Sequence, residues 1–122
     1  MANILIIDDS KTSRKILRNL LEAEGHVIVG EAVNGEDGIA KFKELRPDIT
    51  TLDITMPVLD GLEALKLIMN EDEKAKVVMV TAAGQKNKMV DALKHGATEY
   101  ISKPFEPEQI ISIISKVADE KN

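Results

Sequence analysis

Apolar and polar positions along the chain follow two alternating patterns. The first is a short run of aliphatic residues bounded by polar or turn residues, which is typical of strands buried on both faces of a sheet. It predicts strands at residues 4–7, 48–53, 77–81 and 98–102. Another apolar run, at residues 26–32, has polar ends and is predicted to be an edge strand.

The second pattern is a helical repeat of apolar residues, which predicts amphipathic helices at residues 12–24, 35–45, 62–69, 85–95 and 107–117. Ser10 can cap the first of these, and Pro107 suits the first position of the last. Gly25 and Gly96 are placed to end two of the helices. The residues expected to face the core are Ile16, Leu17, Leu20 and Leu21 in the first helix and Ile110, Ile111, Ile114 and Val117 in the last.

Strands and helices alternate five times, and this order predicts an α/β fold with a parallel sheet covered by helices on both faces. A chain of 122 residues is long enough for one such sheet, so we expect a single domain at residues 1–122. Hydrophobic residues make up 43% and charged residues 30% of the chain, as in an ordinary globular protein.

Composition excludes several kinds of partner and site. Aromatic residues are only 2% of the chain and the net charge is -5, which argues against nucleic acid because bases stack on rings and phosphates repel an acidic surface. The chain has no cysteine, so disulfides and thiolate metal sites are excluded. It also shows no basic signal-peptide segment and no apolar run near the ~20 residues of a membrane span. We expect a cytoplasmic protein whose partners are proteins, not nucleic acid or membrane.

Chemically useful residues occur where the predicted strands end. Asp8 and Asp9 follow the first strand, and Asp53 closes the third. Thr81 closes the fourth strand and Lys103 follows the fifth. Parallel strands place their carboxyl ends along one edge of the sheet, where open α/β sheets bind ligands. If the first and third strands are neighbours, a strand spacing of ~4.8 Å brings the three aspartates together.

Three carboxylates at this spacing repel one another, so at least one should have a raised pKa when no cation is bound. Their oxygens suit Mg²⁺ holding several waters, and the set is too small to surround Ca²⁺. A carboxylate can also act as a nucleophile and form an acyl phosphate, with a metal and Lys103 neutralising the transferred group. With the Thr81 hydroxyl as a hydrogen-bond donor, the set indicates a site that accepts a phosphoryl group.

Each of these residues has a simpler interpretation when taken alone. Asp9 or Ser10 can merely cap the first helix. Thr81 can be a turn residue, Lys103 a solvated side chain and Tyr100 a half-buried edge residue. Their joint placement at the ends of separate strands favours the functional interpretation, because independent accidents would not converge on one crevice.

Four segments carry a family resemblance. They are Ile6-Ile7-Asp8-Asp9-Ser10, Asp53-Ile54-Thr55-Met56-Pro57 with Asp60-Gly61, Thr81-Ala82, and Lys103-Pro104-Phe105. In their order and spacing the chain resembles, over essentially its whole length, the receiver domains of the response-regulator family, and most of all its stand-alone chemotaxis members. The resemblance implies a flavodoxin-like (βα)5 fold with strand order 2-1-3-4-5 and a cis peptide bond at Lys103-Pro104.

The resemblance also implies how the acidic residues act. Asp53 would be the phosphoacceptor, receiving its phosphoryl group from a phosphohistidine on a kinase. Asp9 and Asp53 would bind Mg²⁺ directly, together with the backbone carbonyl of Thr55. Asp8 would act on the metal largely through water.

By the same resemblance, Lys103 pairs with the phosphate and the backbone N–H of Ala82 binds one of its oxygens. Thr81 and Tyr100 correspond to the family's switch pair. In such a pair, phosphate would draw the Thr81 hydroxyl towards it, and the Tyr100 ring would turn inward into the vacated space. This changes the face made by the fourth helix, the fifth strand and the fifth helix.

Thr55 and Ala83 depart from the family pattern. They occupy positions, two after Asp53 and two after Thr81, where the family often has amide or acidic side chains that influence attack of water on the acyl phosphate. Neither residue supplies such a group, so we expect spontaneous dephosphorylation no faster than is typical of the family.

These observations favour a monomeric single-domain response regulator that takes phosphate from a histidine kinase (CheA-like) and binds a motor switch or adaptor protein in chemotaxis, with a phosphatase as a further partner. It is expected to be a phosphoacceptor that assists its own phosphorylation and dephosphorylation, not an enzyme acting on external substrates. The alternatives are a phosphorelay intermediate and a receiver excised from a larger regulator. A Mg²⁺-dependent aspartyl phosphatase fits less well, because this chain lacks the Asp-x-Asp motif and the cap of such enzymes. A flavin-binding module also fits less well, because this chain lacks a loop suited to wrapping the flavin phosphate.

Overall fold

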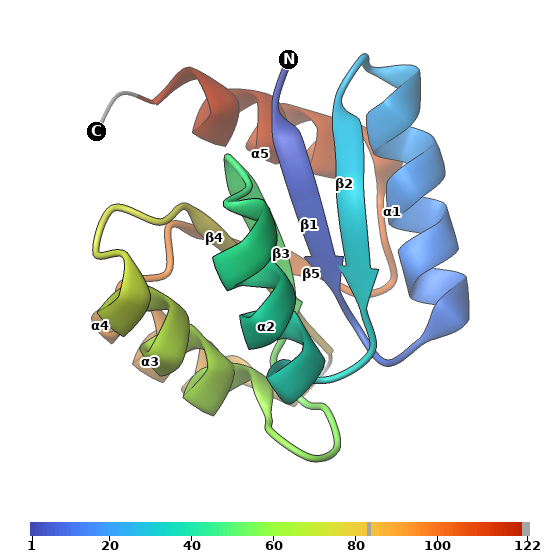
Figure 1. The fold of residues 1–122 in the computed structure, drawn as a ribbon. Coiled ribbons are helices and arrows are strands. Elements are labelled where there is room, and N and C mark those ends of the chain that lie inside the picture. Colours follow the sequence, from blue (N-terminus) through green and yellow to red (C-terminus); the bar gives the residue numbers. More distant parts are fainter. Residues whose placement is uncertain (83, 121–122) are drawn as a thin grey trace.

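The computed structural model describes residues 1–82 and 84–120, so Ala83, one of the two positions linked above to hydrolysis, is outside the described part. Within that part, five strands alternate with five helices (Figure 1). The strands are β1 (Asn3–Ile7), β2 (Val27–Ala32), β3 (Ile49–Asp53), β4 (Val77–Thr81) and β5 (Glu99–Ser102). The helices are α1 (Lys11–Ala23), α2 (Gly35–Leu45), α3 (Gly61–Glu71), α4 (Lys86–Lys94) and α5 (Pro107–Asp119).

The strands form one parallel sheet in the order β2-β1-β3-β4-β5. This confirms the α/β prediction and the flavodoxin-like order that the family resemblance implied. Since all the strands are parallel, β1, β3, β4 and β5 end at the same edge of the sheet. In Figure 1 the arrowheads of β1 and β2 point to this edge, opposite to the N-terminus.

One irregularity interrupts the sheet. Ile4 of β1 pairs with Ile28 of β2, but the next residue, Leu5, pairs with Gly30. Val29 is therefore an extra residue on β2, which makes this edge strand bulged.

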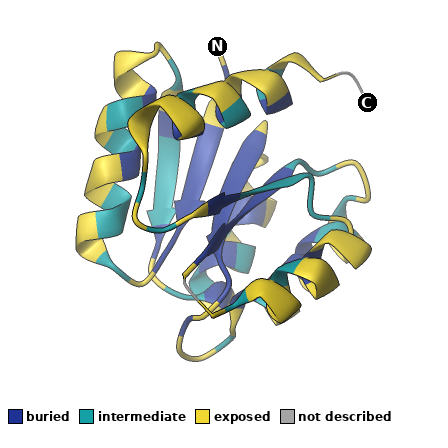
Figure 2. Cartoon of the chain, turned by 180° about the vertical axis from the view of Figure 1, so that it is seen from behind, coloured by how far each residue is buried: buried dark blue, intermediate teal, exposed yellow. Residues whose placement is uncertain are grey.

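The side chains of the sheet alternate between two apolar layers. In β1, Ile4 and Ile6 pack with α1 and α5, whereas Leu5 and Ile7 pack with α2, α3 and α4. Figure 2 shows the strands largely buried between helices whose outer surfaces are exposed. Since both faces are covered, the polar residues of the sheet have access to solvent mainly at the strand ends.

Two predicted core positions are wrong. Ile16 of α1 is 41% exposed, while Leu17 and Leu21 are fully buried. At 3.6 residues per turn, Ile16 lies about 120° from the centre of the buried stripe. In α5, Ile113 packs against the core and Ile111 is not among the residues that do. Around the helix axis, Ile113 lies closer than Ile111 to the centre of the buried stripe, which is made by Ile110, Ile114 and Val117.

Helix boundaries follow the predicted signals. The Ser10 hydroxyl caps α1 by accepting a 3.2 Å hydrogen bond from the N–H of Ser13. Pro107 begins α5, and Gly25 and Gly96 follow the ends of α1 and α4. No helix in residues 1–82 or 84–120 is long and apolar enough to cross a membrane.

Candidate functional site

Three aspartates meet at the carboxyl edge of the sheet. Asp8 follows β1 and is fully buried, Asp53 ends β3 and is 6% exposed, and Asp9 is exposed. One carboxylate oxygen of each lies within 4.8 Å of the others. The convergence predicted from the strand ends is therefore present, because β1 and β3 are neighbours in the sheet.

Asp8 is fixed by three hydrogen bonds, which join it to β2 and to α1 with its N-cap residue. Its Oδ1 accepts a 2.8 Å hydrogen bond from the N–H of Ser10, and its own N–H donates to the carbonyl of Ala32 at 3.0 Å. Its carbonyl accepts a 2.8 Å bond from Arg14 Nη1, and Arg14 Nε is in turn 3.0 Å from Glu31 Oε1. Backbone and side chain of Asp8 are thus both held in place.

Asp53 is positioned by the loop that follows β3. Its Oδ1 accepts a 3.3 Å hydrogen bond from the N–H of Thr55, and the N–H of Gly61 donates to the carbonyl of Ile54 at 2.7 Å. A Cβ atom on Gly61 would lie only 2.0 Å from the Asp53 carbonyl oxygen, so a side chain cannot fit there without a backbone shift. Within this loop Val58 has φ 70°, an unfavourable value for a β-branched residue.

Lys103 faces two of the carboxylates. Its Nζ is 3.3 Å from Asp8 Oδ2 and 3.4 Å from Asp53 Oδ2. Its N–H donates to the carbonyl of Thr81 at 2.7 Å, which aligns the ends of β4 and β5. The following Lys103-Pro104 bond is cis, as the family resemblance implied. One ammonium opposite three carboxylates leaves the ionised cluster with a net negative charge.

The pKa of the Asp53 carboxyl is raised to about 6, first because burial disfavours its charged form and then because the Asp8 carboxylate repels it. Lys103 and the N–H of Thr55 act in the opposite direction. The predicted direction is confirmed, although burial contributes more than repulsion. Burial also opposes the charge of Lys103, but the carboxylates of Asp53 and Asp8 outweigh it and raise the lysine pKa.

The cluster fits a divalent cation. Oxygen donors without nitrogen or sulfur suit Mg²⁺, and the exposed Asp9 leaves a solvent side for the waters that Mg²⁺ retains. Asp8 Oδ2 is buried and has no hydrogen-bond partner within residues 1–82 and 84–120, despite its ion-pair distance to Lys103. An unsatisfied carboxylate oxygen and the excess negative charge are both relieved by a bound cation.

A second group of residues surrounds the end of β4. Thr81 is buried, and its hydroxyl donates a long 3.5 Å hydrogen bond to the carbonyl of Ile101. The N–H of Ala82, expected to bind phosphate, instead donates to Gln85 Oε1 at 2.7 Å. Gln85 Nε2 donates to the hydroxyl of Thr55.

Gln85 was missed by the sequence analysis. It precedes α4 at the N-cap position but makes no capping hydrogen bond with its side chain. The apolar pattern predicted a helix at residues 85–95 with Gln85 as its first residue, so it gave no indication that this side chain would contact another loop.

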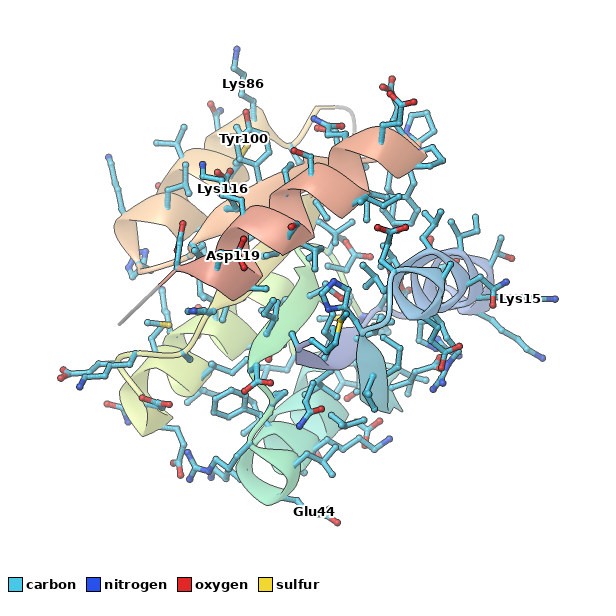
Figure 3. The ribbon with its side chains drawn as sticks, turned by 90° about the horizontal axis from the view of Figure 1, so that it is seen from above. Lys15, Glu44, Lys86, Tyr100, Lys116 and Asp119 are labelled. Atoms are coloured by element: carbon cyan, nitrogen blue, oxygen red, sulfur yellow. The ribbon has the colours of Figure 1, made fainter. Side chains whose placement is uncertain are left out.

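Tyr100 is half-buried on β5, beside a cavity of about 230 Å³ at the end of β4. Figure 3 shows Tyr100 next to Lys86 of α4, away from Lys15 of α1. The cavity is therefore on the α4 and β5 side of the site. Its lining residues are Thr81, Ala82, Gly84, Gln85, Lys86, Met89, Tyr100 and Ser102.

The structure thus brings Asp8, Asp9, Asp53 and Lys103 together and places Thr81 and Tyr100 around the adjoining cavity. A carboxylate beside a lysine, with oxygen ligands for a cation, can act as a nucleophile toward a phosphoryl group.

Comparison with known proteins is consistent with this chemistry. Residues 4–115 match the family model described as the response regulator receiver domain. The chain is 44% identical over 118 residues to a chemotaxis protein CheY of Listeria monocytogenes, covering 97% of this chain and 99% of that one. It is 41% identical over 115 residues to a chemotaxis protein CheY of Thermotoga maritima, covering 94% and 96%.

Among solved structures, a similar one is that of the CheX-CheY-BeF3-Mg+2 complex from Borrelia burgdorferi. The TM-score is 0.92 and the sequence identity 37%, with 97% of this chain and 90% of that chain covered.

Proposed function

Because the chain belongs to the response regulator receiver domain family, we propose that it is a single-domain response regulator, residues 1–122, which accepts a phosphoryl group on Asp53 from a histidine kinase. The observation that carries the proposal is the Asp53 carboxylate held 3.4 Å from Lys103 Nζ in an acidic cluster suited to Mg²⁺. Asp53 is buried enough to be shielded from bulk solvent, yet lies at the open edge of the sheet.

In the proposed reaction, an oxygen of Asp53 attacks the phosphorus of a phosphohistidine. The O–P bond forms as the P–N bond breaks, and the imidazole nitrogen leaves with the electron pair of that bond. Lys103 Nζ, already within 3.4 Å of both Asp8 and Asp53, is placed to pair with the phosphoryl oxygens. Bound Mg²⁺ supplies neutralisation of the charge on the transferred group. Asp9, Asp53 and the carbonyl of Thr55 would hold the ion, with Asp8 acting through water.

The proposed response involves the residues around the adjoining cavity. The Thr81 hydroxyl and the Ala82 N–H would bind phosphoryl oxygens, and the Tyr100 ring would turn into the space beside Thr81. Phosphorylation would then shift the population toward a state with a different α4-β5-α5 face. This face would bind the target of a monomeric regulator.

Kinship to CheY proteins supports a role in chemotaxis, with a CheA-like kinase as donor and a motor switch or adaptor as target. The complex of CheX with CheY from Borrelia burgdorferi supports binding of a further protein partner, which we propose to be a phosphatase.

The direct test is intact mass after incubation with acetyl phosphate and Mg²⁺. The protein should gain one phosphoryl group, and Asp53→Asn should gain little or none. Asp60→Asn is the matched control, because Asp60 is an exposed aspartate that caps α3 and should not affect phosphorylation. Equal phosphorylation of Asp53→Asn and the unmodified protein would refute the assignment.

The lifetime of the phosphorylated protein tests the departures at Thr55 and Ala83. We expect decay in Mg²⁺ to be no faster than is typical of CheY proteins, since neither residue brings an amide or acidic group to the acyl phosphate. Decay of the mass-shifted species followed over time measures it, and a lifetime of a few seconds would contradict the expectation.

A further inference from the structure

The side chain of Gln85 connects the two loops that border the phosphoacceptor. Its Oε1 accepts the N–H of Ala82 at 2.7 Å, and its Nε2 donates to the hydroxyl of Thr55, which lies on the other loop. The N–H of Thr55 in turn donates to Asp53 Oδ1 at 3.3 Å. We term the contacts of the Gln85 carboxamide with Ala82 and Thr55 the Gln85 bridge.

We propose that Gln85 is a positioning residue that competes with the phosphoryl group for the N–H of Ala82. The inference rests on the proposed function, in which this N–H binds a phosphoryl oxygen. In the unphosphorylated protein the carboxamide oxygen takes the place of that oxygen. Phosphorylation of Asp53 therefore has to break the Gln85 bridge before the new group is fully bound.

Competition follows from the geometry of a single donor. At 2.7 Å the bond from Ala82 to Gln85 Oε1 is short for an N–H donor, and one N–H cannot make two full-strength bonds at once. A charged phosphoryl oxygen is the stronger acceptor and displaces the neutral carboxamide. Loss of the bond from Ala82 to Gln85 lowers the net free energy gained when the phosphoryl group binds, so the Gln85 bridge weakens phosphoryl binding.

The surroundings of Gln85 allow it to leave. The side chain is only partly buried and Thr55 is exposed, so both polar groups can be solvated after separation. The preceding Gly84 has φ +87°, and a Cβ built on it would meet no described residue other than its chain neighbours within 4 Å, which leaves room around Gly84. Because Gln85 directly precedes α4, its displacement reaches the first turn of that helix.

The test measures binding of beryllofluoride, which occupies the place of a phosphoryl group on a carboxylate, in saturating Mg²⁺. Gln85→Ala removes the competitor and should bind beryllofluoride about fivefold more tightly, the effect of one ordinary hydrogen bond. Gln85→Glu keeps an acceptor for Ala82 and adds a negative charge, so it should bind about fivefold more weakly. Gln109→Ala, which removes an exposed glutamine side chain on α5, should leave the affinity unchanged.

Opposite effects of the two Gln85 substitutions separate competition from a structural role, since loss of packing would weaken binding in both. The affinity of Gln85→Ala for Mg²⁺ alone should stay within twofold, because the Ala82 N–H is not a metal ligand. Thr55→Val removes only one end of the Gln85 bridge, so its affinity for beryllofluoride should lie between those of the unmodified protein and Gln85→Ala.

A measurement on the unmodified protein complements the variants. Saturation with beryllofluoride and Mg²⁺ should shift the NMR signals of the Gln85 side-chain NH₂ group, because its bond to Thr55 breaks. Unchanged signals, or equal beryllofluoride affinity in Gln85→Ala and the unmodified protein, would overturn the inference while phosphorylation of Asp53 stands. Failure of the unmodified protein to bind beryllofluoride or accept phosphate would overturn both.

Discussion

The two halves of the site are held in different ways. The acidic half, around β1 and β3, is fixed by backbone contacts. Asp8 is bonded at its N–H, carbonyl and carboxylate, and the loop after Asp53 is packed so closely that Gly61 has no space for a Cβ. The half around β4 and β5 is connected by the Gln85 side chain and borders a cavity beside the half-buried Tyr100.

The difference indicates how one site can both hold charge and transmit a signal. Converging carboxylates repel one another, so they need a frame that does not relax when their charge changes. A responding element needs the opposite, namely contacts that are replaced at low cost. Apart from the carboxylates themselves, substitutions in the acidic half should therefore mainly change the free energy of unfolding. Substitutions in the half around β4 and β5 should mainly change phosphoryl binding.

The largest expected stability effect is the cost of the Asp53 charge. Its pKa is about 6 in the folded protein against 3.8 for an unperturbed aspartate, so the folded protein binds this proton more tightly than the unfolded chain does. Without metal, stability should fall as the pH rises from about 4 to about 6, by about 3 kcal/mol from this group. Urea unfolding in chelator across this range measures the change.

Asp53→Asn lacks this titration and serves as the comparison. The difference in unfolding free energy between the variant and the unmodified protein should grow with pH across the same range and then level off. A pH-independent difference would show that the Asp53 charge is not costly to the folded protein. It would then contradict the view that the acidic half holds this charge at a cost in stability.

A glycine pair tests the contrast in rigidity. Gly61→Ala puts a Cβ at 2.0 Å from the Asp53 carbonyl oxygen and should cost about 2 to 3 kcal/mol of unfolding free energy. The Cβ of Gly84→Ala would meet no described residue beyond its chain neighbours, so this substitution should cost only about 1 kcal/mol, from the positive φ. Urea unfolding of both variants compares the two loops, and equal costs would contradict the contrast.

A pair of threonine substitutions tests what a buried hydroxyl group of the sheet contributes to stability. The Thr51 hydroxyl on β3 is buried and has no hydrogen-bond partner within the described residues. Thr51→Val should raise the unfolding free energy by about 1 kcal/mol, because an unsatisfied polar group is replaced by a methyl of similar size. Thr98→Val should lower it by a similar amount, since Thr98 Oγ1 accepts a 3.2 Å bond from the N–H of Val77. Thermal melts of the pair should move in opposite directions.

The smallest expected effect concerns strain in the loop after β3. Val58 is 73% exposed at φ 70°, where a β-branched residue is disfavoured and asparagine is tolerated. Val58→Asn should stabilise the protein by about 0.5 to 1 kcal/mol, measured by urea unfolding. Destabilisation would mean that the exposed valine makes contacts worth more than the strain.

Much of the fold and of the acidic half could be predicted from the sequence. Asp8, Asp53 and Lys103 were identified because strand ends of a parallel sheet share one edge, whichever way the helices pack. The prediction of which residues of α1 and α5 face the core was less accurate, because periodicity gives the direction of an apolar stripe but not its width. Ile16 and Ile111 are on the flanks of those stripes.

The half around β4 and β5 was harder to predict for a physical reason. The bond from Gln85 to Thr55 joins residues 30 positions apart and depends on the side-chain conformation of a polar residue, which leaves no periodic signal. The pKa of Asp53 shows the same limit. The sequence indicated repulsion between carboxylates, but the larger contribution of burial depends on how closely the loops cover the site.

The bulge in β2 has a consequence for how molecules of this protein meet one another. A sheet edge presents unpaired N–H and C=O groups that can recruit a strand from a second copy. The extra residue Val29 breaks the regular spacing of such groups and increases the local twist. We therefore expect the bulge to disfavour edge-to-edge pairing of two molecules through β2.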